Sequence, residues 1–310
     1  MIYDKKIFIT GGAGFLGKNL IKRYYNDNEI TIYSRDETKH YYVKKQFPKI
    51  NCIIGDIYDY DNLKRSSKNH DIGIFTASLK QIEAVDQNYE IANRTIINGA
   101  INSRRITEEN NFDSACFISS DKSRAATTLY GAMKFVAGES FIVNSDESKS
   151  KLSTAIYGNV LNSTGSIIPL IWDSINNNYV LKLYSKEMTR FMLSIDEAVD
   201  IVEESLKYTG YNIIPIIKSF NIKDLFDIYS ERYGLKYIVT EPRISEKIHE
   251  IMVSNEEVPR IKKVGDYYHM HYKKIFNEVN FDNNEYSSKN CVMTKDELSK
   301  KLQKYNYFKP

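Results

Sequence analysis

The sequence predicts an α/β fold in which a doubly wound parallel sheet is followed by a smaller α/β region. Short apolar runs alternate with helical stretches through the first half of the chain. A glycine-rich turn, Thr10-Gly-Gly-Ala-Gly-Phe-Leu-Gly17, joins the first apolar run to the first helical stretch. Together these observations are typical of a parallel sheet with helices on both faces, which binds ligands at the carboxyl ends of its strands.

The elements can be placed in order along the chain. Apolar runs predict strands at residues 7–9, 30–33, 51–54, 72–75, 115–119 and 153–157. The clearest helical stretches are residues 59–67, 89–110 and 128–144. After residue 162 the spacing of motifs changes, so a second unit is expected there, and the polar stretch 277–289 predicts a long loop or arm.

The glycine-rich turn predicts a nucleotide site. Without side chains, the backbone can approach a pyrophosphate, whose negative charge is favoured at a helix N-terminus. A purely structural glycine turn is the alternative. The residues expected at the pyrophosphate are Thr10, Gly11, Gly14, Phe15, Leu16 and Gly17.

A second group of polar residues follows the fifth apolar run. Ser120, Asp121 and Lys122 come first, and Tyr130 and Lys134 follow, four residues apart and therefore on one face of a helix. There the lysine cation can lower the pKa of the phenol, and the phenolate can take a proton from a substrate hydroxyl. A chance spacing of Tyr and Lys, and a surface ion pair of Asp121 with Lys122, are the alternatives.

Composition excludes several classes of protein. The chain has 310 residues, 42% of them hydrophobic, and a net charge of +3, so no basic field indicates nucleic-acid binding. Cys52, Cys116 and Cys291 are widely spaced, which favours a reducing compartment, and no Cys/His cluster has metal-ligand spacing. His269 and His271 indicate a strand edge rather than a metal site. No run of about 18 apolar residues predicts a membrane span, and a cytoplasmic location is expected.

The two motifs together resemble the extended short-chain dehydrogenase/reductase family. Within it, Phe117-Ile-Ser-Ser-Asp-Lys122 is similar to the catalytic motif of the inverting UDP-N-acetylglucosamine 4,6-dehydratases. The tail Glu285-Tyr-Ser-Ser-Lys-Asn290 is similar to that of capsular-polysaccharide members. Other segments match this subgroup in order, so that the resemblance covers essentially the whole chain: 77–81, 157–160, 165–169, 188–191 and 243–250.

The resemblance implies a domain organisation. Residues 1–160 would form an NADP-binding Rossmann domain, and residues 161–310 a smaller α/β substrate-binding domain with a C-terminal tail. A later strand near 211–214 would return to the first domain. Relatives form homo-oligomers, so an assembly between a dimer and a hexamer is expected.

It also implies a reaction, because loss of water from C5 and C6 of a hexose becomes feasible once C4 is a ketone. Tyr130, helped by Lys134, would take the O4 proton, and Lys134 would also hold the nicotinamide ribose. Lys122 would be the base at C5, provided that burial and the cofactor depress its pKa. Asp121, with a raised pKa, would protonate the departing hydroxyl, and Ser120 would hydrogen-bond O4. A lysine here, where retaining relatives have glutamate, predicts inversion at C5.

The end of the second strand favours NADP over NAD. Ser34 and Arg35 match a 2′-phosphate, whereas Asp36 comes one position late and is expected to cap the next helix. A solvated Arg35 is the alternative. Asp56 resembles the aspartate that binds the adenine amine. Further positions that the resemblance assigns to the cofactor are Ile57, Ala77 and Lys80.

The resemblance assigns UDP-sugar binding to residues later in the chain. Asn159, Arg190 and Arg243 would hold the diphosphate, Glu246 would face the uridine ribose, and Lys80 could reach the sugar. Ile156 and Thr164 stand where the family commonly has arginine, which could alter diphosphate binding. Two other functions remain open: a UDP-sugar 4-epimerase of the same fold, and a non-catalytic binder of NADP or a sugar nucleotide.

Overall fold

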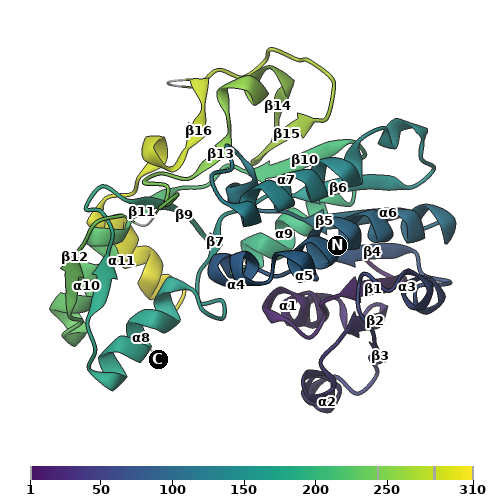
Figure 1. The fold of residues 1–310 in the computed structure, drawn as a ribbon, viewed down its shortest axis with the longest axis horizontal. Coiled ribbons are helices and arrows are strands. Elements are labelled where there is room, and N and C mark those ends of the chain that lie inside the picture. Colours follow the sequence, from purple (N-terminus) through teal and green to yellow (C-terminus); the bar gives the residue numbers. More distant parts are fainter. Residues whose placement is uncertain (1, 243, 282–283, 309–310) are drawn as a thin grey trace.

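The computed structural model describes residues 2–242, 244–281 and 284–308. In these residues the central sheet has nine strands, in the order β14-β15-β10-β6-β5-β4-β1-β2-β3 (Figure 1). From β3 to β10 each pair of neighbouring strands is parallel, whereas β15 is antiparallel both to β10 and to β14. Their bounds are β1 (Lys6–Thr10), β2 (Glu29–Ser34), β3 (Asn51–Ile54), β4 (Ile72–Phe75), β5 (Ser114–Ile118), β6 (Lys151–Ala155), β10 (Tyr211–Pro215), β14 (Ile261–Val264) and β15 (Tyr267–His271).

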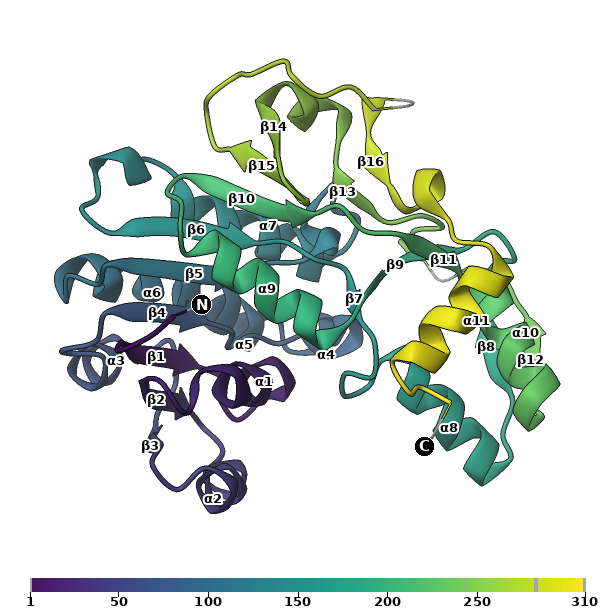
Figure 2. The ribbon, with the colours of Figure 1, turned by 180° about the vertical axis from the view of Figure 1, so that it is seen from behind.

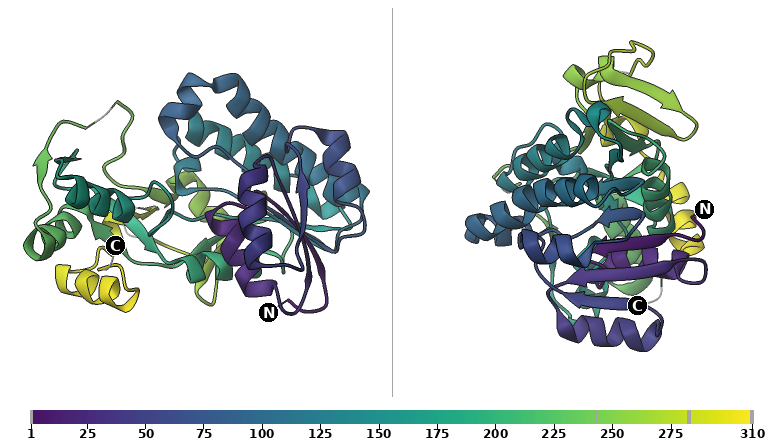
Figure 3. Two further views of the ribbon diagram at one scale, coloured as in Figure 1. Left: turned by 90° about the horizontal axis from the view of Figure 1, so that it is seen from below. Right: turned by 90° about the vertical axis from the view of Figure 1, so that its right-hand side faces the viewer.

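Helices cover both faces of this sheet (Figure 2; Figure 3). Successive side chains of β1 point to opposite faces of the sheet, and both faces are apolar. Ile7 and Ile9 are buried in one apolar cluster, and Phe8 is buried in another on the opposite face. The doubly wound α/β class is therefore confirmed. The first cluster includes side chains of α1 (Phe15–Tyr24), α2 (Glu37–Gln46) and α9 (Ile195–Ser205). The second includes α3 (Tyr60–Ser66), α4 (Ile82–Gln87), α5 (Tyr89–Asn93), α6 (Gly99–Glu109) and α7 (Leu129–Ile142).

The helix predicted over residues 89–110 is interrupted in its hydrogen bonding. Between α5 and α6, residues Arg94–Asn98 form a π-helical turn, and the backbone stays helical at both junctions. The helices predicted at 59–67 and 128–144 are α3 and α7, whose first turns are capped by Asp59 and Thr128. Each cap satisfies a backbone N–H that the helix itself leaves unpaired.

The second unit is built on α8 (Ile167–Asn177), α10 (Ile222–Tyr233) and α11 (Lys295–Lys304), which gather on the side of the molecule away from β1 to β3 (Figure 1). Their apolar side chains share one cluster. The small sheets beside them are formed by β7 (Asn159–Val160), β9 (Thr189–Leu193) and β11 (Ser219–Asn221); by β8 (Leu181–Leu183) and β12 (Tyr237–Val239); and by β13 (Ile251–Val253) and β16 (Tyr286–Ser287).

The later part of the chain returns to the first sheet twice. Strand β10 pairs in parallel with β6, with Tyr211 opposite Ser153. The hairpin of β14 and β15, which the sequence analysis did not predict, then extends the sheet beyond β10. His269 and His271 lie on β15 between two strands and are buried, so the expectation of a strand edge is wrong. Among the described residues, no group of three or more His, Cys, Asp or Glu could hold a metal ion.

The expectation of a long loop over residues 277–289 is also wrong in part. Tyr286–Ser287 forms β16, paired with β13, and a 3-10 turn follows at Ser288–Cys291. Tyr286 is buried against Phe191, and its hydroxyl donates to the Ile217 carbonyl at 2.9 Å. These contacts hold Tyr286 against β9 and the residues that follow β10. In the helices that the structure describes, no segment is long and apolar enough to cross a membrane.

Candidate active site

The glycine-rich turn forms a cradle at the carboxyl end of β1. Gly11 has φ +68°, and a Cβ there would lie 2.7 Å from the Thr76 hydroxyl oxygen, so the turn requires glycine. Gly14 begins α1 without a side-chain cap, which leaves N–H groups of the first turn, at Phe15 and Leu16, for another acceptor. A Cβ at Gly17 would lie 2.4 Å from the Gly12 carbonyl oxygen, so this glycine allows the helix to pack on the turn. These features fit the pyrophosphate of a dinucleotide.

The end of β2 carries the residues predicted to select the cofactor. Arg35 is 56% exposed and lies 3.4 Å from the Asp56 carboxylate. The Ser34 hydroxyl lies 2.6 Å from Nε2 of His40. Asp36 accepts a hydrogen bond from the Lys39 N–H at 2.9 Å and caps α2, which confirms that prediction. The Ile57 side chain is buried in the core, whereas Ala77 follows β4 and is half-buried.

The Ser-Asp-Lys motif lies in a short turn after β5. The carboxyl of Asp121 is 1% exposed and accepts hydrogen bonds on Oδ1 from the Ser120 hydroxyl at 2.9 Å and the Lys122 N–H at 2.8 Å. Its Oδ2 is buried without a hydrogen-bond partner. Burial raises the pKa of Asp121, although the Lys122 charge opposes this. A protonated Asp121 is what a general acid requires, so the expected direction of its pKa shift is confirmed.

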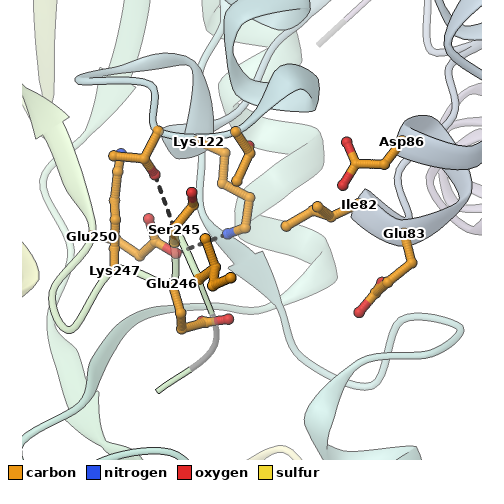
Figure 4. Close-up of a pocket in the computed structure, with 11 residues that line it drawn as sticks. Ile82, Glu83, Asp86, Lys122, Ser245, Glu246, Lys247 and Glu250 are labelled. Atoms are coloured by element: carbon orange, nitrogen blue, oxygen red, sulfur yellow. Dashed lines mark hydrogen bonds and ion pairs between the residues drawn. The ribbon is translucent and has the colours of Figure 1, made fainter. Parts of the chain in front are cut away.

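The Lys122 amine points toward a buried carboxylate, that of Glu250 (Figure 4). Its Nζ lies 2.9 Å from Glu250 Oε1 and 3.5 Å from Asp121 Oδ1. Burial works to lower the pKa of Lys122, but the two carboxylates outweigh it and raise that pKa. The expectation of a depressed pKa is therefore wrong for this structure, because it did not include Glu250.

Glu250 is the site residue that the sequence reading missed. It is buried, its Oε1 also lies 3.4 Å from Nε of Arg190, and its Oε2 is buried without a hydrogen-bond partner. Burial would raise the pKa of Glu250, but Lys122 and Arg190 lower it to about 2. Glu250 closes the matched segment 243–250, so a charged residue beside a recognised motif was the available signal.

Tyr130 and Lys134 share the inner face of α7 but do not act on one another as predicted. Burial raises the pKa of Tyr130 to about 12, and the cation that opposes this shift is Lys122. The Lys134 amine instead donates to the Ile118 carbonyl at 2.5 Å, and burial lowers the pKa of Lys134 to about 7. The predicted lowering of the phenol pKa by Lys134 is therefore wrong, because the lysine amine binds the carbonyl at the end of β5 and is not among the charges that shift Tyr130.

The residues predicted to bind the UDP-sugar are differently placed. The Lys80 amine donates to the Thr164 carbonyl, and its partial burial there lowers the pKa of Lys80 although the residue as a whole is exposed. Asn159 has a buried Oδ1 without a hydrogen-bond partner. Arg190 is buried, and its Nη2 donates to Glu246 at 2.6 Å. The prediction for Arg243 falls outside the described residues.

The structure also shows the surroundings of Ile156 and Thr164, the two positions where the resembled family commonly has arginine. Ile156 is fully buried in an apolar cluster with Phe191 and Met252, so its side chain faces the core. Thr164 supplies the carbonyl that accepts the Lys80 amine. Neither side chain brings a charge to the site.

A pocket of about 160 Å³ lies in front of the Lys122 amine. One wall comes from α4 and the other from the segment 244–250, so residues far apart in the sequence face each other across it (Figure 4). Its lining residues are Ile82, Glu83, Asp86, Lys122, Thr127, Thr128, Ile244, Ser245, Glu246, Lys247 and Glu250.

Comparison with known proteins places this site in a family. A profile described as polysaccharide biosynthesis protein matches residues 7–272. The chain belongs to this family. An inverting UDP-N-acetylglucosamine 4,6-dehydratase of Campylobacter jejuni is 31% identical, over 86% of this chain and 83% of its own. The resemblance to the extended short-chain dehydrogenase/reductases is therefore confirmed for family and fold.

Other members of the comparison carry different names. A protein of Methanocaldococcus jannaschii named an uncharacterized membrane protein is 30% identical over 98% of this chain and 97% of its own. A UDP-glucose 4-epimerase of Rickettsia bellii is 30% identical over 90% and 88%. The X-ray structure of Pen from Bacillus thuringiensis covers 98% of this chain and 99% of its own, with a TM-score of 0.90 and 23% identity, which indicates a shared fold.

Proposed function

We propose that this protein is a UDP-sugar 4,6-dehydratase that inverts C5, acts on UDP-N-acetylglucosamine and serves surface polysaccharide synthesis. Relatives at about 30% identity include both dehydratases and epimerases, and they support a UDP-sugar dehydratase or epimerase as the broader class. The observation that carries the narrower choice is the cluster of Asp121, Lys122 and Glu250 beside Tyr130.

Dehydration needs proton transfers that epimerisation at C4 does not. A dehydratase must move a proton at C5 and supply one to the oxygen leaving C6. Burial raises the pKa of Asp121, which favours its role as the acid that gives a proton to that oxygen. Lys122 is the group that would exchange the C5 proton. It can take that proton only as the neutral amine, so C5 exchange should rise with pH.

A nicotinamide cofactor fits the turn at Gly11 and the uncapped start of α1. When bound, it would supply hydride transfer between C4 and C6 of the sugar. Arg35, exposed at the end of β2, supports NADP rather than NAD, because a guanidinium can bind a 2′-phosphate through two parallel hydrogen bonds. Tyr130 would take the O4 proton, Ser120 would hydrogen-bond that oxygen, and Lys134 would hold the nicotinamide ribose.

The pocket in front of Lys122 would take the sugar. Asn159, with an unpaired buried oxygen, and Arg190 lie on neighbouring strands β7 and β9, which supports a role for both at the diphosphate. Glu246 lines the pocket and would face the uridine ribose. Arg190 is paired with Glu246 and Glu250 in this structure, so diphosphate binding would have to compete with two carboxylates.

One experiment separates the candidate functions. The purified protein is incubated with UDP-N-acetylglucosamine and NADP in heavy water, and the products are followed by NMR. A C6 methyl signal with deuterium at C5 is expected for the dehydratase. A C4 epimer without a methyl signal would identify the epimerase, and no change in the sugar with tight cofactor binding would favour the non-catalytic binder.

Two variants assign the roles of the acid and the amine. Lys122→Ala should stop both C5 exchange and water loss, by about 10²–10⁴-fold, with cofactor binding retained. Asp121→Asn should keep part of the C5 exchange and block loss of the hydroxyl, because the two residues serve different atoms. An equal loss of cofactor binding in both variants would show that the pair is structural.

A further inference from the structure

We propose that Glu250 is a positioning residue that aims the Lys122 amine at the pocket and holds its proton. The inference rests on the proposed function for its role in catalysis, but the contact itself can be tested without any substrate. Nothing in the Ser-Asp-Lys motif indicates this residue, because it lies 128 positions further along the chain.

The contact is built as a constrained ion pair. The Glu250 side chain is 3% exposed, whereas that of Lys122 is 27% exposed, so the carboxylate is fixed in the wall and the amine is at the pocket surface. At 2.9 Å, a charge-assisted hydrogen bond of this kind restricts the rotamers of the longer side chain. The amine is thereby held where Figure 4 shows it, facing the pocket.

The backbone of Glu250 is fixed independently of Lys122. Its N–H donates to the Ser288 hydroxyl at 2.8 Å, and its carbonyl accepts from the Ser288 N–H at 2.8 Å. Strand β13 begins at the next residue and pairs with β16. The carboxylate is therefore placed by the tail segment, and the amine adjusts to the carboxylate.

The charges around the amine leave Glu250 as its closest counter-charge. Asp121 is farther, at 3.5 Å, although its carboxylate also raises the pKa of Lys122. Arg190 shares Glu250 Oε1 and opposes a second positive charge. Removal of the Glu250 charge should therefore release the proton of Lys122 at lower pH. The charged and titratable groups that face the amine from the packed elements are Asp121, Glu250, Arg190, Tyr130 and Lys247.

The test measures the charge of Lys122 directly. Full-length protein is treated briefly with acetic anhydride across a pH series, and mass spectrometry gives the labelling of Lys122 relative to the exposed Lys186, since only the neutral amine reacts. In Glu250→Gln the midpoint for Lys122 should fall by about 1–3 pH units, the usual effect of removing a close opposite charge. At a fixed pH below the midpoint this means at least about 10-fold more labelling.

Glu246→Gln is the matched control. Glu246 lies in the same pocket and pairs with the same arginine, but the structure gives it no contact with Lys122 among the described residues. In Glu246→Gln the pH midpoint of Lys122 labelling should therefore stay at the wild-type value. An equal shift in both variants, or no shift in Glu250→Gln, would overturn the inference.

A third variant separates the effect of the carboxylate charge at position 250 from that of the side-chain length. Glu250→Asp keeps the charge but shortens the side chain, so its midpoint should lie between those of the wild type and Glu250→Gln. If Glu250→Gln does not fold, this variant carries the test, and a midpoint equal to that of the wild type would overturn the inference.

Deuterium exchange at C5 is then compared at several pH values, and its rising limb should move to lower pH with the labelling midpoint. If the wild type gives no exchange at any pH, the proposed function fails while the labelling result stands.

Discussion

Glu250 and Ser288 are joined by two hydrogen bonds: the Glu250 N–H donates to the Ser288 hydroxyl, and the Ser288 N–H donates to the Glu250 carbonyl. The same hydroxyl lies 2.7 Å from that of Thr189, next to Arg190 on β9. A single buried serine in the tail therefore joins the segment that carries Glu250 to the strand that carries Arg190.

Replacement of Ser288 by alanine should weaken both stability and the site. It would leave the Glu250 N–H buried without its acceptor, which costs about 1–3 kcal/mol in the free energy of unfolding. Urea unfolding measures this loss, and acetylation of Lys122 shows whether Glu250 has moved. Ser299→Ala, where the serine accepts a hydrogen bond from Arg232 at the surface, is the control and should cost well under about 1 kcal/mol. Equal stability of the two variants would contradict the prediction.

A methyl group at position 158 should displace the carboxyl of Asp121, the proposed acid. A Cβ there would lie 2.9 Å from Asp121 Oδ2 and 3.1 Å from the Cβ of Phe191, and both side chains are buried. Gly158→Ala should therefore shift the Asp121 carboxyl and reduce turnover by up to about 10²-fold, with cofactor affinity unchanged. Gly138→Ala on α7 is the control, since its Cβ would make only ordinary contacts, 3.5 Å from Ser119. Full activity of Gly158→Ala would show that the carboxyl can move without cost.

His269 should make the protein less stable in mild acid. Burial lowers the pKa of His269 to about 4, from about 6.5 in the unfolded chain. The folded state therefore binds fewer protons than the unfolded state between these values. Its stability is complete above about pH 6.5 and falls on the order of 3 kcal/mol toward pH 4. Urea unfolding of His269→Gln should show a shallower pH dependence over this range. If stability depends on pH equally in the wild type and the variant, protonation of His269 does not contribute to the loss of stability in acid.

Arg124 should be essential for folding although it touches no predicted ligand. It is fully buried, and its Nη1 lies 3.2 Å from Glu139 on α7 and 2.6 Å from Glu257. Arg124→Ala leaves these carboxylates without their cation and should cost about 3–5 kcal/mol in the free energy of unfolding. Arg105→Ala, at an arginine that is 50% exposed and pairs with Glu109, should cost less than about 1 kcal/mol. Thermal unfolding of both variants under the same conditions measures the two losses of stability.

Arg35 should discriminate between the two nicotinamide cofactors. Its side chain is 56% exposed, and its ion pair with Asp56 is long, at 3.4 Å, so the guanidinium can turn toward a 2′-phosphate. Arg35→Ala should weaken NADP binding about 10-fold or more, equivalent to about 1.4 kcal/mol, and leave NAD binding nearly unchanged. Calorimetric titration with each cofactor measures both affinities. Parallel losses for NADP and NAD would assign the arginine to a part that the two cofactors share.

The first half of the fold could be predicted because its signals are local. Each of the six predicted strands is a short apolar run, and Asp36 and Thr128 cap helices within three residues of the groups that they satisfy. The hairpin of β14 and β15 could not be predicted, because its pairing with β10 depends on residues some 50 positions away.

The Ser-Asp-Lys motif could be found in the sequence, but the raised pKa of its lysine could not be predicted. The expected depressed pKa of Lys122 depended on burial and on the cofactor's charge, and burial does act in that direction. The decisive groups come from elsewhere: Glu250 from the far end of the chain, and Arg190 from β9. Likewise Arg124 had no motif to mark it, since its partners on α7 and after β13 meet only in the folded protein.

The return of β10, β14 and β15 to the first sheet has a consequence for biosynthesis. While the chain is being translated, β6 has no neighbour on one side until Tyr211–Pro215 has left the ribosome, and β10 in turn waits for Tyr267–His271. Exposed strand edges of this kind pair readily with other chains. A nascent chain of this protein should therefore need shielding until nearly all of it has been made, and a fragment that stops at residue 160 should aggregate rather than fold.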